Sequence, residues 1–216
     1  MYKHVYDCFK HYYHGGSIYL YSDPHFADEE MKYLRSNYVG DEEQVRRINS
    51  RVVKNDTIIF LGDIGDVKWI KKIRGYKVLI MGNHDKGANH YKRVVLKTHE
   101  SECNPEVMTK LTNCVYKDGY YIYDNHLFDE VYEGCLMISP KIILSHEPVH
   151  FPYAYNIHGH THSGAALTPT SICVCAEHID YTPVHLGNLI RSGIMKDIPD
   201  IHRVTIDNAI ERKMGI

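Results

Sequence analysis

Five short polar segments contain the residues of this chain whose types and spacing could do chemistry. They are residues 23–25, 62–66, 82–85, 145–147 and 158–162. Each segment follows apolar residues, so we expect each where a strand ends and a loop begins. In open α/β sheets, binding sites form at that edge. The sequence therefore predicts that the five segments carry one site.

The five segments hold seven side chains that could bind a metal. They are Asp23, His25, Asp63, Asn83, His146, His160 and His162. Oxygen and imidazole donors without cysteine favour Mn²⁺, Fe or Zn²⁺ over a structural zinc site with thiolate ligands. A single Zn²⁺ takes about four ligands. Seven donors therefore predict two divalent metal ions that share a bridging carboxylate, and Asp63 is the natural bridge.

The order of the segments resembles that of the calcineurin-like metallophosphoesterases, whose pattern is D-x-H, GD-x-x-D, GNH-[DE], a later lone His and GH-x-H. The resemblance covers roughly residues 17–189. It implies two ligand sets: Asp23, His25, Asp63 and His162 for the first metal, and Asp63, Asn83, His146 and His160 for the second. It also implies that His84 faces the substrate and that Asp66 orients the His84 ring. Manganese is the favoured metal, with iron or zinc as alternatives.

The hydrolysis of a phosphate ester needs the groups that such a site would provide. Hydrolysis of a phosphate ester needs a nucleophilic oxygen, stabilisation of the charge on the phosphoryl oxygens and a proton for the leaving group. Two cations about 4 Å apart can supply the first two, and His84 is placed to supply the third. The sequence and the resemblance together predict a metal-dependent phosphoric ester hydrolase.

Two positions at which this chain differs from members of the family that it resembles restrict the predicted substrate class. Phosphatases of this superfamily that act on phosphoproteins carry arginines where this chain has Val67 and Met81. Their absence favours the small prokaryotic or phage-type subgroup and a small phosphodiester, with a nucleotide as one candidate. A phosphomonoesterase, a nuclease and a non-catalytic scaffold on the same fold remain alternatives.

The net charge of −2 does not favour a broad nucleic-acid surface. The basic residues of segments 46–54 and 68–77 are typical of solvated helix faces.

The resemblance implies an α/β fold, namely a four-layer αββα sandwich of two mixed β-sheets flanked by helices. The residues alone leave a doubly wound single sheet open. Chain length and 44% hydrophobic content fit one domain over residues 1–216. No run approaches the roughly 20 apolar residues of a membrane helix, and the N-terminus lacks an apolar signal core, so we expect a cytoplasmic protein that does not enter membranes.

Local patterns predict the elements that position the motifs. Helices are predicted at 41–53, 69–73, 105–111 and 186–192. Besides the strands that precede the motifs, including 57–61 and 77–81, strands are predicted at 172–175 and 202–206. An Asp118-Gly119 turn between aromatic and β-branched residues predicts a hairpin over 115–123.

Two regions extend beyond the motifs. Residues 1–16 form an N-terminal extension, and the spacing of four apolar residues in it predicts a helix: Tyr2, Val5, Tyr6 and Phe9. We expect this helix to pack on the body of the protein; a homodimer contact or a lid over the site are the alternatives. Residues 90–123 form an insertion that contains the predicted helix and hairpin. The insertion's tyrosines could stack on a nucleobase, although ordinary packing is the simpler expectation.

Several further residues have a structural interpretation. His158 lies one position before the GH-x-H motif and is expected to be structural, while His178 and His185 are expected at the surface. Cys173 and Cys175 are expected to pack as small hydrophobic residues. Two further acids, Asp85 and Glu147, flank ligands and are candidates for outer partners of the site. The prediction that His146 is a metal ligand rests on the resemblance, because a single histidine has no spacing pattern of its own.

Overall fold

The computed structural model describes residues 6–8 and 15–214. Most of the helix predicted in the N-terminal extension therefore lies outside the described residues. The described chain is a mixed α/β structure with three sheets, which confirms the predicted α/β class.

A five-stranded sheet carries the first three motifs. Its strands, in the order β12-β1-β2-β3-β7, are Val184–His185, Ile18–Tyr21, Thr57–Phe60, Tyr76–Ile80 and Glu130–Tyr132. All neighbours are parallel except β12, which is antiparallel to β1. The strands predicted before the second and third motifs are confirmed, each shifted or shortened by one residue.

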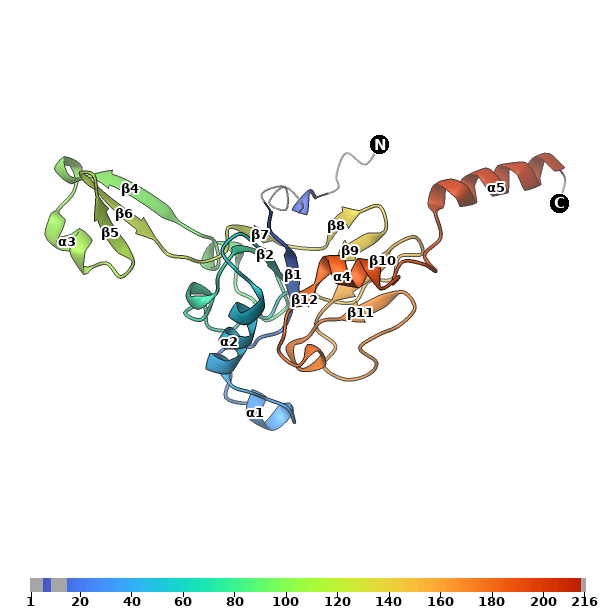
Figure 1. The fold of residues 1–216 in the computed structure, drawn as a ribbon, viewed down its shortest axis with the longest axis horizontal. Helices are drawn as coiled ribbons and strands as arrows, with labels where there is room; N and C mark the ends of the chain where they lie inside the picture. The colour runs from blue at the N-terminus through green and yellow to red at the C-terminus, as the bar shows by residue number, and fades with distance from the viewer. Residues whose placement is uncertain (1–5, 9–14, 215–216) are drawn as a thin grey trace.

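A four-stranded sheet carries the last two motifs. Its strands, in the order β11-β10-β9-β8, are Ser171–Cys173, Tyr155–His158, Ile142–Leu144 and Leu136–Ser139. Leu20, Ile59 and Val78 of the five-stranded sheet share one buried cluster with Leu144 and Ile157 of this sheet. Burial of these apolar side chains between the two sheets holds the sheets together. The two sheets are next to each other in Figure 1, with β1 beside β12 and helix α4.

The longest helix of the central body lies over the other side of the five-stranded sheet. Helix α2, Asp41–Arg51, begins with three acidic residues, which favour a helix N-terminus. Its Val45 and Ile48 join a second buried cluster with Phe60 and Leu79 of the sheet. The helix predicted over 41–53 is therefore confirmed with an earlier end. Short helices α1, Met31–Leu34, and α4, Leu186–Arg191, complete the body.

The predicted insertion forms a separate three-stranded antiparallel sheet. Its strands, in the order β4-β6-β5, are Val95–His99, Tyr120–Asp124 and Cys114–Lys117, and helix α3, Pro105–Lys110, lies beside β5. The β5–β6 hairpin and the helix are confirmed. Asp118 and Gly119 both have positive φ, as an Asp-Gly hairpin turn requires, and the Asn104 side chain caps α3. Figure 1 shows this sheet projecting from the body at the left.

The strand predicted over 202–206 is wrong, because this segment is part of helix α5, Ile201–Met214. The Asp200 carboxylate accepts a hydrogen bond from the Arg203 backbone N–H at 3.2 Å, as a helix cap does. Arg203 also pairs with Asp207 one turn later. Figure 1 shows α5 extending away from both large sheets, so no strand is beside it to pair. Among the described helices, none combines the length and apolar character needed to cross a bilayer.

Candidate metal centre

The five motifs meet because the strands before them end at neighbouring positions. Strands β1, β2 and β3 are parallel neighbours, and so are β9 and β10. Parallel strands present their carboxyl ends at one edge of a sheet. Packing of the two sheets brings the two edges together, so the predicted convergence of the motifs is confirmed.

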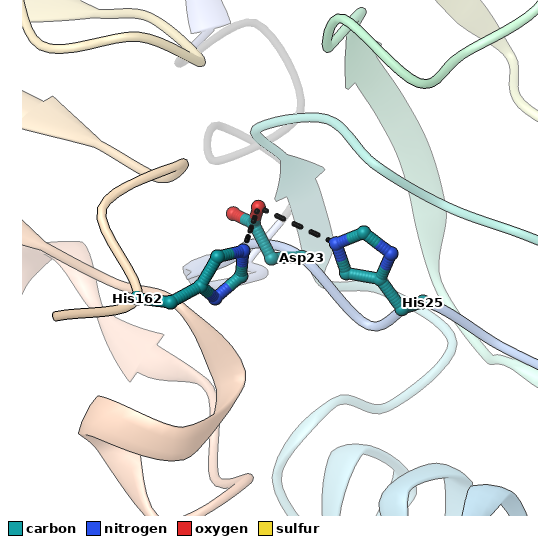
Figure 2. Close-up of side chains that lie close together, drawn as sticks. All are labelled: Asp23, His25 and His162. Carbon is teal, nitrogen blue, oxygen red and sulfur yellow. Dashed lines mark ion pairs between the residues drawn. The ribbon is translucent and has the colours of Figure 1, made fainter. Parts of the chain in front are cut away.

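Asp23, His25 and His162 form the first group of donors. Figure 2 shows the two imidazoles directed at Asp23, with His162 Nε2 3.4 Å and His25 Nε2 3.9 Å from Asp23 Oδ1. Within the described part of the chain, Asp23 Oδ1 and His25 Nε2 are buried without a hydrogen-bond partner. Unsatisfied buried polar atoms cost roughly 1–3 kcal/mol each. One donor atom from each of the three residues lies within 4.8 Å of the others, so this group fits a divalent cation.

Asn83, His146 and His160 form the second group. The Asn83 Oδ1 atom lies 2.8 Å from His146 Nε2 and 3.1 Å from His160 Nδ1, and the two ring nitrogens are 3.2 Å apart. The His146 Nδ1 atom is 2.7 Å from the Leu61 carbonyl oxygen, which can only accept a hydrogen bond. We therefore assign the proton to Nδ1, which leaves the Nε2 lone pair facing the amide oxygen. Two acceptors this close repel each other unless a cation binds both.

Asp63 lies between the two groups. Its Oδ2 atom is 3.6 Å from His25 Nε2 of the first group and 3.6 Å from His146 Nε2 of the second. Its other oxygen accepts a hydrogen bond from the His84 backbone N–H at 2.9 Å. The carboxylate is almost fully buried. The structure thus brings together all seven donors expected from the sequence and puts Asp63 where a bridging ligand would lie.

The backbone at the site is strained. Asp23, His25, Asp63 and His160 all have φ between 45° and 64°, a region that non-glycine residues rarely adopt. Each such residue costs on the order of 1 kcal/mol or more and persists only where its surroundings enforce it. Four of the seven donors therefore leave their strands with a backbone conformation that ordinary strand geometry does not predict.

Asp85 holds two of the motif loops together. One of its oxygens accepts hydrogen bonds from the backbone N–H groups of Asp63 and Gly82, at 3.0 and 2.8 Å. The other accepts from Ile64 N–H at 3.0 Å. The expectation that Asp85 is an outer partner of the site is confirmed, and it acts by fixing the backbone of the bridging aspartate.

Two motif glycines are required by close approach. A Cβ atom on Gly82 would lie 2.3 Å from Asp63 Oδ1, and a Cβ atom on Gly159 would lie 2.2 Å from Asp23 Oδ2. Both distances are far inside van der Waals contact. These glycines therefore allow the backbone to pass directly against the carboxylates that the site uses.

Hydrogen-bond donors that contact one of its two carboxylate oxygens orient Asp23. Its Oδ2 atom accepts hydrogen bonds from the Ser22 hydroxyl, from Cys175 Sγ at 3.2 Å and from the His160 backbone N–H at 3.0 Å. This oxygen is saturated, so Oδ1 is left to face His25 and His162. Cys173 and Cys175 are buried as expected, but Cys175 also contacts a predicted ligand.

Glu177 and Arg35 are site residues that the sequence did not reveal. Glu177 Oε1 lies 2.6 Å from His162 Nδ1, and Glu177 Oε2 lies 3.4 Å from Arg35 Nε. Burial alone would raise the pKa of Glu177, but the hydrogen bond with His162 and the charge of Arg35 outweigh it and lower the pKa. The ionised carboxylate places the His162 proton on Nδ1 and leaves Nε2 toward Asp23. One sequence signal could have indicated Glu177, because it closely follows the strand predicted over 172–175, as the five motifs follow theirs.

The electrostatics of His25 suit a neutral ligand. Burial, followed by the positive charge of Arg35, lowers the pKa of the His25 imidazole, although Asp23 and Asp63 act in the opposite direction. A neutral imidazole has a free lone pair for a metal, whereas an imidazolium has none.

We expect replacement of Glu177 by glutamine to weaken metal binding by about 10- to 100-fold, because such outer partners typically contribute that much. The amide keeps the size of the side chain but loses the charge that orients His162. Competition with a chelator would measure the change. Glu147→Gln is the matched control, since Glu147 is exposed and flanks His146. Equal affinity in Glu177→Gln and wild type would contradict the role given to Glu177.

The predicted pair between Asp66 and His84 is not formed. Asp66 Oδ1 accepts a hydrogen bond from the Lys68 backbone N–H at 2.8 Å, and Asp66 Oδ2 lies 3.0 Å from Lys68 Nζ. An aspartate that bonds to the backbone two residues later forms a local turn, and this turn competes successfully with a partner on another loop. His84 is exposed, and its ring is 5.7 Å from the His25 ring, centroid to centroid.

The remaining histidines support the loops. His158 is buried, with Nδ1 2.8 Å from the Gly159 carbonyl oxygen, so its structural interpretation is confirmed. His178 and His185 are only partly exposed, unlike the surface positions expected for them. The His178 Nε2 atom lies 3.0 Å from the Thr161 carbonyl oxygen between two ligands, and His185 caps helix α4.

No family model matches the chain, and no curated protein matches it. Among solved structures, the chain is similar to a protein of unknown function from Aquifex aeolicus, with 21% sequence identity and a TM-score of 0.56. The likeness covers 82% of this chain and 98% of that chain. At this level of identity, the comparison establishes a shared fold.

Proposed function

We propose that this chain is a dinuclear-metal phosphoesterase with the four-layer αββα fold of the calcineurin-like enzymes. The observation that carries the proposal is the position of Asp63, whose Oδ2 atom is 3.6 Å from a histidine of each donor group. Two divalent ions held there, with manganese favoured over iron or zinc, would provide an activated water and stabilise the phosphoryl charge. The fit of the donors is supported by the buried unsatisfied atoms of Asp23 and His25.

His84 is the residue we propose to act on the leaving group. It follows Asn83 directly, and its backbone N–H donates to Asp63, so the imidazole is held beside the donor groups without belonging to either. An exposed ring can reach a substrate and give its proton to the departing oxygen. Because Asp66 is paired with Lys68, we assign protonation of the leaving group to His84 without a partner aspartate.

The cavities around His84 support a diester substrate. One cavity of about 560 Å³ is lined by His84 together with His25, His162 and Arg35. A second cavity of about 420 Å³ lies against His84, Asp66, Lys86 and Tyr91. A phosphodiester has two organic groups on its phosphorus, and a pair of cavities that meet at one histidine could hold both.

The lining of the larger cavity argues against the nuclease alternative. Asp28, Glu30 and Glu177 place three carboxylates in it against the single guanidinium of Arg35. Polyanions bind where cations gather, so we propose a small substrate whose leaving group is neutral or cationic. The tyrosines of the projecting sheet are not among the lining residues of either cavity.

Turnover of two nitrophenyl esters tests the proposal. After chelation and reloading with Mn²⁺, the protein should hydrolyse bis-nitrophenyl phosphate, and it should hydrolyse the monoester nitrophenyl phosphate about tenfold or more slowly, since the second cavity contributes only with a diester. Failure of Mn²⁺, Fe²⁺ and Zn²⁺ alike to restore turnover of either ester would refute the hydrolase. Faster turnover of the monoester would retain the hydrolase and reject the diester preference.

A further inference from the structure

Lys77 is a buried cation whose charge the protein does not pair. Its ammonium Nζ donates to the Ile73 carbonyl oxygen at 3.1 Å, and the residue is only 7% exposed. An ammonium group has three N–H donors. In the described part of the chain, no carboxylate lies within ion-pair distance of it. A buried ammonium with one neutral partner is costly, and such groups normally have a counter-charge.

The Asp129 carboxylate acts on the charge of Lys77 but is bound to other groups. Asp129 accepts the Lys77 backbone N–H at 2.9 Å through one oxygen and pairs with Arg93 through the other. Arg93 is in turn held by Asp124. These contacts fix the loop that enters β7 and leave the Lys77 ammonium without an anionic partner.

Lys77 also lines a cavity. It has a volume of about 300 Å³ and is lined by Lys54, Lys71, Lys77 and Arg93, with His126 and the single carboxylate of Asp129. Among the described residues, neither Lys54 nor Lys71 has an ion-pair partner. The cavity therefore carries more positive than negative charge, and its cations come from four separate places in the sequence.

The cavity is distinct from the candidate metal centre. Lys77 is the second residue of β3, whereas the ligand Asn83 follows the carboxyl end of the same strand. Six residues of extended chain span on the order of 20 Å. None of the residues that line this cavity lines either cavity beside His84.

We propose that this cavity is a binding site for a phosphate group of a small molecule. Three lysines and one arginine line this one space, and cationic N–H donors match the multiple acceptor oxygens and the double negative charge of phosphate. The volume accepts inorganic phosphate or a compact phosphomonoester. Burial lowers the pKa of Lys77, and a bound anion would reverse that effect by stabilising the charged form.

The test is phosphate-dependent thermal stability of the full chain after its metals are removed by chelation, because metal ions at the candidate metal centre would themselves bind phosphate. With inorganic phosphate at a hundred times its Kd, the wild-type Tm should rise by roughly 5 °C. Lys77→Met keeps the apolar stem and removes the charge, so it should fold at least as stably as wild type and lose most of this rise. Lys213→Met, on the exposed helix α5, should keep the full rise. An equal rise in wild type and Lys77→Met would overturn the proposal.

Three further measurements test the site without Lys77, distinguish a phosphomonoester from free phosphate, and separate this site from the proposed function. Lys54→Met with Lys71→Met changes only exposed residues and should weaken phosphate binding by about tenfold or more, which provides a test that does not depend on the buried position. Adenosine monophosphate should compete with inorganic phosphate if the site takes phosphomonoesters, and only inorganic phosphate should bind if it takes the free ion. Diester turnover should be unchanged in Lys77→Met, so the outcome is independent of the proposed function. No effect of any of these lysines on phosphate binding would refute the site.

Discussion

Replacement of Asp63 by asparagine should remove both metal ions and with them nearly all activity. The amide has nearly the shape of the carboxylate but no charge, and one oxygen of the carboxylate is 3.6 Å from a histidine in each donor group. A metal clamp contributes several kcal/mol to stabilising the transition state, and each 1.36 kcal/mol is a factor of ten. We expect kcat/KM for a diester to fall by about a thousandfold or more. Elemental analysis should find fewer than one metal per chain.

Asp66→Asn is the matched control for metal content. Asp66 lies in the same motif, three residues later, but its carboxylate pairs with Lys68. The control should therefore keep the wild-type metal content. Retention of two metals by Asp63→Asn would reject the bridging role, and loss of only one would assign Asp63 to a single donor group.

The convergence of the site was predictable because it depends on few physical rules. Buried apolar strands that precede Asp63, Asn83 and His146 are typical of a parallel sheet, and parallel strands present their carboxyl ends at one edge. The Asp-Gly turn and the Asn104 cap are equally local, since each is decided by residues within a few positions. These elements agree with the structure because their sequence neighbours determine them.

The features that the sequence did not predict depend on contacts between residues that are distant in sequence. Glu177 reaches His162 only because the four-stranded sheet places β11 beside β10, and Arg35 reaches Glu177 across 142 positions of sequence. The α5 segment contains β-branched residues that suggested a strand, yet no strand of the described residues pairs with it, and it forms the helix that Asp200 caps. The Asp66–His84 pair failed for a related reason, because the resemblance implied a partner where a local turn supplied a nearer one.

His84→Ala should slow the hydrolysis of an alkyl phosphodiester by about 10²- to 10⁴-fold, the usual contribution of a general acid. A nitrophenolate leaves readily without a proton, so the same change should slow bis-nitrophenyl phosphate by only about tenfold or less. Metal content should stay at the wild-type value, because the His84 contact with Asp63 is made by the backbone N–H, which alanine retains.

The difference between the two substrates separates proton donation from positioning. His84 lines both cavities, so its removal could also loosen the hold on the substrate, and that loss would be the same for both esters. An equal slowing of the two esters would therefore assign His84 to substrate positioning and reject its role as an acid. His150→Ala is the matched control, because His150 is exposed and lines neither cavity, and it should leave both rates unchanged. A larger loss on the alkyl ester, with both metals retained, can arise only if the imidazole acts on the leaving oxygen itself.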